Sequence, residues 1–338
     1  AAASAERQLV NAFTVRDPSL SPKSIVATGD GLFFAQNMMY QHNVSVFDRT
    51  GAKVATISDR VDLAAFGIPN GATVSGSPVE AAVTPDGRFV YVSNYKMYGP
   101  GFNPVASDDC NAGNWNDSFV YKIDVATLQI VGVIPTGAVP KYLAVSPDGA
   151  RLVVANWCGF DVSVIDTASD TELGRLHVGR HPRGIAITPD SRYAFVAVMG
   201  GARIDMIDLA TLQVVHSLPA AVAGTTPRHL VISPDGNTLY VSNNVLNSVR
   251  KIDLTTNSLV AVTRTGTQTR TMALSDDGAS LYVVNYEDGT VTKVRTSDMT
   301  VLQTVYSGHH PIGVTYDPPT RQLWVANYSG TIRVFTDE

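Results

Sequence analysis

Short apolar runs separated by polar turns recur along the chain at intervals of about forty residues. In one copy the turn Ser146-Pro147-Asp148-Gly149 is followed by apolar runs at 152–156, 162–166 and 172–178, and an apolar run also precedes each turn, as at 184–188 in the next copy. Pro presets such a turn and Gly accepts its positive φ, while the β-branched residues of the runs are typical of strands. Four short antiparallel strands in each copy predict the blade of a β-propeller.

Aligning the turns gives seven copies and therefore predicts seven blades. The aligned positions, preceded by a degenerate copy at 29–31, are Pro85, Pro147, Pro189, Pro234, Asp276 and Pro318. The last copy has strands at 312–316, 322–327 and 331–336 but lacks a fourth. A strand-like segment at 8–15 precedes the first copy, and we expect it to complete the last blade and close the ring.

The whole chain, 1–338, is therefore expected to form one all-β, seven-bladed propeller domain with residues 1–7 as an N-terminal tail. The phrase Tyr-Val-Ser-Asn stands at 91–94 and 240–243, after Pro-Asp-Gly turns in both copies. In these motifs the chain resembles the YVTN-repeat seven-bladed β-propeller family, from about residue 20 to its end. The resemblance implies an exported or surface-layer-type propeller. It does not imply one function, because related seven-bladed propellers include periplasmic binding proteins, lactonases and lyases.

Composition limits the class of partner. Charged residues make up 16% of the chain and its net charge is -5, so nucleic acid is not expected to bind. No apolar stretch approaches the roughly 18 residues that cross a bilayer. The small residues at 1–5 resemble what remains after signal-peptide cleavage, so we expect an exported (periplasmic, cell-surface or secreted) protein, with a trimmed sequence as the alternative.

The second copy contains extra residues. They form a predicted loop, 95–118, between its second and third strands, and we expect a wall of a binding site there, with packed decoration as the alternative. The loop contains Cys110, and the only other cysteine, Cys158, begins the equivalent loop of the third copy. An even cysteine count in an exported chain predicts a disulfide between the two, against two free thiols.

The same loop is rich in oxygen ligands, namely Asp108, Asp109, Asn111, Asn114, Asn116 and Asp117. Their spacing does not match a calcium-binding loop, so we expect a solvated polar loop without a metal. The pair His309-His310 is not expected to hold a metal either, because neighbours on a strand point to opposite faces. No motif for catalysis or nucleotide binding is present, and we predict neither a catalytic residue nor a cofactor.

The strongest functional signal is a column of basic residues at the start of the first strands. Five of the seven copies have a cation there, and these are Lys23, Lys141, Arg183, Arg228 and Arg270. First strands line the axis of a propeller, so the five side chains are expected to ring one mouth of its channel. Histidines crowd the same connections and aromatic residues follow the second strands; the candidates are His181, His229, His309, His310, Trp157, Tyr286 and Tyr328.

A ring of cations favours an anionic ligand. The leading hypothesis is a monomeric exported protein that binds an anionic small molecule or saccharide, or a protein partner, on the face that carries the loop. One alternative is an enzyme of lactonase or lyase type that uses the histidines as acid and base, and another is a structural surface component. The cations could instead pair with carboxylates such as Glu80 and Glu287 and serve only as contacts between blades.

Overall fold

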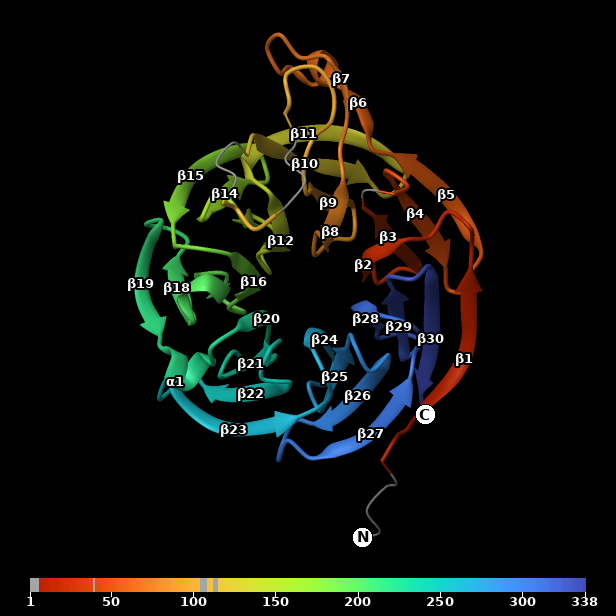
Figure 1. The fold of residues 1–338 in the computed structure, drawn as a ribbon, viewed down its shortest axis with the longest axis vertical. Helices are drawn as coiled ribbons and strands as arrows, with labels where there is room; N and C mark the ends of the chain where they lie inside the picture. The colour runs from red at the N-terminus through yellow and green to blue at the C-terminus, as the bar shows by residue number, and fades with distance from the viewer. Residues whose placement is uncertain (1–5, 39, 104–107, 112–114) are drawn as a thin grey trace.

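The computed structural model describes residues 6–38, 40–103, 108–111 and 115–338, which form a ring of seven four-stranded sheets (Figure 1). All strand pairs within the sheets are antiparallel. The first strand of each blade lies nearest the axis in Figure 1 and the fourth forms the rim. The predicted all-β, seven-bladed propeller with four antiparallel strands per blade is confirmed.

Blades one to four follow the chain from the axis to the rim. Blade one contains β2 (Pro22–Ala27), β3 (Leu32–Asn37), β4 (Asn43–Asp48) and β5 (Lys53–Ser58). Blade two contains β8 (Pro78–Val83), β9 (Phe89–Asn94), β10 (Asp117–Asp124) and β11 (Gln129–Ala138). Blade three contains β12 (Pro140–Val145), β13 (Arg151–Asn156), β14 (Asp161–Asp166) and β15 (Thr171–His177). Blade four contains β16 (Pro182–Ile187), β17 (Tyr193–Val198), β18 (Arg203–Asp208) and β19 (Gln213–Leu218).

The remaining blades repeat this order, except that the last one takes its outer strand from the N-terminal part of the chain. Blade five contains β20 (Pro227–Ile232), β21 (Thr238–Asn243), β22 (Ser248–Asp253) and β23 (Ser258–Arg264). Blade six contains β24 (Thr269–Leu274), β25 (Ser280–Asn285), β26 (Thr290–Arg295) and β27 (Val301–Tyr306). Blade seven contains β28 (Pro311–Asp317), β29 (Gln322–Asn327), β30 (Thr331–Asp337) and β1 (Leu9–Arg16). Two short helical turns, η2 (Met199–Gly201) and α1 (Ala220–Ala223), lie in blade four and after it.

Pairing of β1 with β30 closes the ring, as predicted. The register runs from Leu9 opposite Asp337 to Arg16 opposite Thr331. Phe33 of blade one stacks on Trp324 of blade seven at 3.8 Å between ring centroids, so the closing strand lies over a continuous core. The N-terminal strand therefore joins the two ends of the propeller through both backbone pairing and apolar packing.

A buried ion pair lies beside this closure. Lys293 Nζ of blade six is 2.6 Å from Asp337 Oδ1 of β30, and both side chains are at most 2% exposed. The same ammonium group donates to the backbone carbonyl of Arg7, 2.7 Å away. Three segments that are distant in sequence thus meet at one lysine.

Buried asparagines at the ends of the second strands fix the connections that enter the blades. The Oδ1 atom of Asn37 accepts a hydrogen bond from Ser21 N at 3.0 Å, and that of Asn94 accepts one from Ser77 N at 3.2 Å. Asn243 bonds Thr226 N in the same way. Each donor directly precedes the proline that opens a first strand, so these bonds position the column of residues that follows. The side of the ring on which these connections lie is called the loop face below. The opposite side, which carries the Pro-Asp-Gly turns, is called the turn face.

Glycine lets two of the innermost strands approach each other. A Cβ added at Gly184 of β16 would lie 2.6 Å from the carbonyl oxygen of Arg228 and 2.8 Å from the Cα of His229 in β20. Both neighbours are backbone atoms and cannot rotate away. Gly184 therefore sets the distance between the basic positions of blades four and five.

A hairpin that the sequence did not predict stands between blades one and two. It consists of β6 (Arg60–Asp62), η1 (Leu63–Phe66) and β7 (Thr73–Ser75), and Figure 1 shows it projecting from the ring. Ser75 forms a β-bridge with Tyr98 of the inserted loop. Val61 and Val74 pack on Met97, so the hairpin supports the base of that loop. Among the described residues, no helix is long and apolar enough to cross a membrane.

The predicted disulfide between Cys110 and Cys158 is present, with a Cα–Cα distance of 5.2 Å. It links the loop between β9 and β10 to the start of the equivalent loop in blade three. Residues 104–107 and 112–114 of this loop lie outside the described residues, as do residues 1–5 of the expected tail. The bridge fixes the described part of the loop over the neighbouring blade.

Deleting residues 1–15 should lower the free energy of unfolding by about 3–6 kcal/mol, because Leu9 and Val15 leave the core and β30 loses its partner strand. Thermal unfolding followed by circular dichroism measures the change. A variant that lacks only residues 1–5 keeps all of β1 and serves as the control. An unchanged melting temperature in the longer deletion would contradict the role of β1 in closure.

Replacing Lys293 with Met should destabilise the protein by about 3–5 kcal/mol, since the buried Asp337 loses its cation partner and keeps only the hydrogen bond from Tyr282. The double change Lys293→Met and Asp337→Leu removes both charges and should recover most of that loss. Urea denaturation of the wild type, both single variants and the double variant tests this. Losses that simply add would show that the ion pair is not coupled.

Candidate functional site

The five cations of the basic column converge on one cavity of about 340 Å³ at the axis. They come from the starts of the first strands in blades one, three, four, five and six. Its lining consists of Lys23, Met38, Val79, Tyr95, Asp108, Lys141, Trp157, Arg183, Arg228 and Arg270. The structure thus brings together side chains that the sequence placed in equivalent positions of separate copies.

Two of the five cations have carboxylate partners. Arg183 lies 3.0 Å from Glu80, and both side chains are less than 10% exposed. Lys141 Nζ lies 2.6 Å from Asp108 Oδ2. Glu80 was expected as a partner, whereas Glu287 makes no ion pair within the described residues, and Asp108 was expected to be a solvated loop residue.

The disulfide explains how Asp108 reaches the site. Cys110 is tied to Cys158, and the indole Nε1 of Trp157 donates to the backbone carbonyl of Asp108 at 2.8 Å. These two restraints place the carboxylate against Lys141. Sequence reasoning missed this contact because nothing in the repeat indicates how a unique loop folds back over the axis.

Aromatic rings hold three of the cations. Lys141 lies over the ring of Trp157 at 3.8 Å, Arg270 over Tyr286 at 3.6 Å and Lys23 over Tyr328 at 4.6 Å. An aromatic face attracts a cation without neutralising it. The aromatic candidates therefore orient these charges without neutralising them, while Lys141 also donates to Asp108 and Arg270 Nη2 donates to Gln268 Oε1.

Positive charge is in excess at the cavity. Its lining contains five cations, and the two carboxylates that pair with them are Glu80 and Asp108. Within the described part of the chain, Arg228 has no ion-pair partner at all. Burying like charges together is costly, and an anion in the cavity would offset that cost.

The pKa values report this crowding. Burial, together with the charges of Arg183 and its neighbours, lowers the pKa of Lys23 to about 7 and that of Lys141 to about 7. Burial also lowers the pKa of Arg270 to about 10 and shifts the pKa of Arg228 well downward. Both lysines are therefore partly deprotonated near neutral pH, where an ordinary lysine stays charged.

The four candidate histidines make different contacts. His181 stacks on Trp157, and His310 stacks on Tyr286, each at 4.3 Å between centroids. The rings of His309 and His310 lie 3.8 Å apart, because they belong to a connection and not to a strand. His229 is 7% exposed, and its Nδ1 accepts a hydrogen bond from Met272 N.

Burial lowers the pKa of His229 to about 3, so this imidazole is neutral at physiological pH. It packs edge-on against Tyr142 of blade three. A proton donor or acceptor for catalysis needs a pKa nearer to 7. His229 is therefore positioned as a structural contact between blades.

No metal centre is formed by the described residues: no three His, Cys, Asp or Glu side chains are grouped as ligands there. Of the oxygen ligands in the loop, Asn114 lies outside the described residues. Asp108 binds Lys141, and Asp117 binds Arg175 at 2.8 Å.

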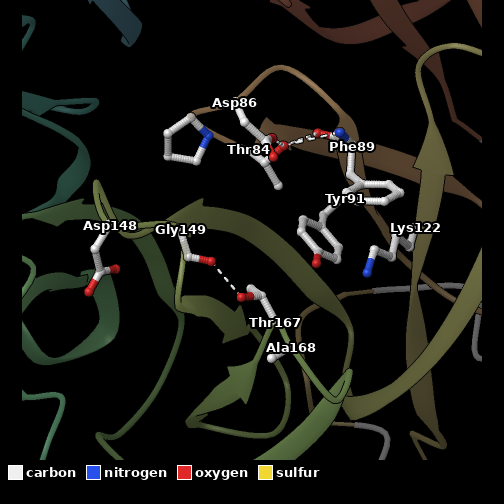
Figure 2. A pocket seen from close by; sticks show the side chains of 10 residues that line it. Thr84, Asp86, Phe89, Tyr91, Lys122, Asp148, Gly149, Thr167 and Ala168 are labelled. Carbon is white, nitrogen blue, oxygen red and sulfur yellow. Dashed lines mark hydrogen bonds between the residues drawn. The ribbon is translucent and has the colours of Figure 1, made fainter.

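A second pocket of about 280 Å³ lies on the turn face, between blades two and three (Figure 2). Its only cation, Lys122, is 2.9 Å from Asp170 and lies over the ring of Phe89. Figure 2 shows Thr167 bonded to the carbonyl of Gly149 and Thr84 beside Asp86. Its charged and polar groups already have protein partners, so it is the weaker candidate.

Comparisons with known proteins agree with the fold. A family model described as "Lactonase, 7-bladed beta-propeller" matches residues 252–337, and no curated protein matches the chain. Among solved structures, Kuenenia stuttgartiensis hydrazine synthase is 21% identical with a TM-score of 0.75, covering 96% of this chain and 98% of that one. A chain of a mitotic checkpoint complex is 12% identical with a TM-score of 0.77, covering 99% and 95%.

At these identities the two structures establish the seven-bladed architecture and nothing about ligands. A second family model, for the choice-of-anchor I domain, matches residues 105–287. This region runs from the inserted loop of blade two to the second strand of blade six, and it includes four of the five cations. Because the match spans more than half of the chain, the protein belongs to the choice-of-anchor I domain family.

Proposed function

We propose that this protein is an exported binding protein whose cavity at the loop face holds a small anion with more than one negative charge. The observation that carries the proposal is the gathering of five cations on one cavity of about 340 Å³. Cavities of this size hold small molecules. Arginine in particular binds carboxylate and phosphate oxygens through two parallel hydrogen bonds.

The ligand class follows from the charges that are already compensated. Glu80 and Asp108 compensate the charges of Arg183 and Lys141, which leaves the charges of Lys23, Arg228 and Arg270 for a ligand. A dicarboxylate, a phosphate, a sulfate or an acidic sugar would meet this excess. The aromatic rings at the rim, Trp157, Tyr286 and Tyr328, could pack on the apolar face of such a sugar.

Export is supported by three observations. The disulfide between Cys110 and Cys158 is of the kind that persists in oxidising compartments. Membership of a choice-of-anchor family and the resemblance to YVTN-repeat proteins agree with a place at or beyond the cell surface. If the ligand is a macromolecule, the proposal is that a protein partner docks on the loop face of a monomer.

The match to the lactonase model supports a second candidate, an enzyme that acts on an anionic substrate. In that case the cations would hold the substrate and a histidine at the rim would move the proton. The low pKa of His229 leaves His181, His309 and His310 for that role. Hydrolysis of a panel of anionic lactones, followed by pH-stat titration, separates the two candidates.

Replacing Arg228 with Ala should weaken binding of sulfate about tenfold or more, because a charge-assisted hydrogen bond contributes about 1.5–3 kcal/mol. Sulfate-dependent thermal stabilisation, measured against chloride at matched ionic strength, gives the affinity. Arg228 is chosen over Arg183, whose loss would strand the buried carboxylate of Glu80.

The control is Arg192→Ala on the turn face, which changes the net charge equally; Arg192 is 62% exposed and 3.7 Å from Asp208. The proposal is wrong if sulfate stabilises both variants as well as it stabilises the wild type.

Anion affinity should fall as the pH rises from 6 to 8. Lys23 and Lys141 lose their protons over this range because their pKa values lie near 7, while the charge of sulfate stays constant. Binding should therefore take up protons near pH 7. Calorimetry in two buffers of different ionisation enthalpy measures that uptake, and Lys23→Met should reduce it. Affinity that is independent of pH would contradict the coupling.

A further inference from the structure

The two lysines of the cavity differ in their partners. Lys141 is held by Asp108 at 2.6 Å and lies over Trp157, so its ammonium form is stabilised by a carboxylate. Lys23 makes no ion pair with any described carboxylate, and its Nζ lies over the ring of Tyr328. One lysine is therefore compensated and the other is not.

The surroundings of Lys23 favour its uncharged form. The guanidinium groups of Arg183, Arg228 and Arg270 all act against the charge on its amine, in addition to burial. A lysine that is desolvated beside other cations is activated as a nucleophile, because only the neutral amine has a free electron pair. The same cations would attract a negatively charged substrate to that amine.

We propose that Lys23 forms an imine with a 2-oxo acid bound in this cavity, so that the site captures its ligand covalently and reversibly. The proposal rests on the anion site described under Proposed function and adds a reactive carbonyl to its ligand. A 2-oxo acid has its carboxylate directly beside its carbonyl. Arg228 or Arg270 can therefore hold the carboxylate while the carbonyl carbon faces Lys23, since all three side chains line one cavity.

The step is balanced without an oxidant or a reductant. The electron pair of the neutral amine forms a C–N bond to the carbonyl carbon, and the electrons of the C=O π bond move to oxygen, which takes a proton. A second proton transfer and cleavage of the C–O bond release the oxygen as water. The net change is one amine, one 2-oxo acid and one proton giving one protonated imine and one water.

Trapping with pyruvate and cyanoborohydride tests the proposal. The full chain is incubated with pyruvate near pH 7, the imine is reduced, and the intact mass is measured. We expect one adduct per chain, with the mass of one pyruvate less one water plus two hydrogens. Peptide mapping should place it on Lys23, with at least tenfold less label on Lys53, which forms a salt bridge with Asp17 away from the cavity.

Two variants serve as controls. Lys23→Arg keeps a positive charge but cannot form the imine, so it should lose the label. Lys53→Arg, which lies away from the cavity, should still be labelled on Lys23 and keep its stabilisation by sulfate. If Lys23→Arg does not fold, the peptide map of the wild type alone decides.

The outcomes separate this proposal from the anion site. No adduct on Lys23, or label spread over many lysines, together with normal stabilisation by sulfate overturns the imine and leaves the anion site standing. Loss of both the adduct and the stabilisation by sulfate overturns both proposals.

Discussion

Ring closure is the constraint on which the other features of this structure depend. Once β1 pairs with β30, the seven first strands are held around one axis and their starting residues must face one another. Charges at those positions cannot separate unless the ring opens. The buried pair of Lys293 and Asp337 and the stacking of Phe33 on Trp324 lie at this closure.

At the cavity, the repulsion between the five cations is only partly compensated by carboxylates. Glu80 compensates Arg183 from within the ring, while Asp108 reaches Lys141 only because the disulfide holds its loop. Aromatic faces stabilise three cations and still leave their positive potential intact. The excess of charge that remains is the basis of the proposal that this cavity binds an anion.

The features that could be predicted from the sequence are those that recur in each copy of the repeat or that can be matched by their position in it. The Pro-Asp-Gly turns indicated the blades, the unmatched strand at 8–15 indicated the closure, and reading one column across the copies found all five cations. The hairpin from β6 to β7 was missed because it occurs once and has no counterpart to align with. The pairing of Asp108 and the burial of His229 depend on contacts between distant segments, which a repeat does not encode.

Burial at the axis links the two proposals through the protons of the lysines. Lower pH protonates Lys23 and Lys141, which the proposed anion site requires, whereas higher pH gives the neutral amine of Lys23 that the proposed imine requires. The two requirements oppose each other, so capture of a 2-oxo acid should be fastest near pH 7, where both forms are populated. Asp108 reaches Lys141 and not Lys23, so the imine proposal assigns binding of the carboxylate in part to Lys141 and the reaction to Lys23.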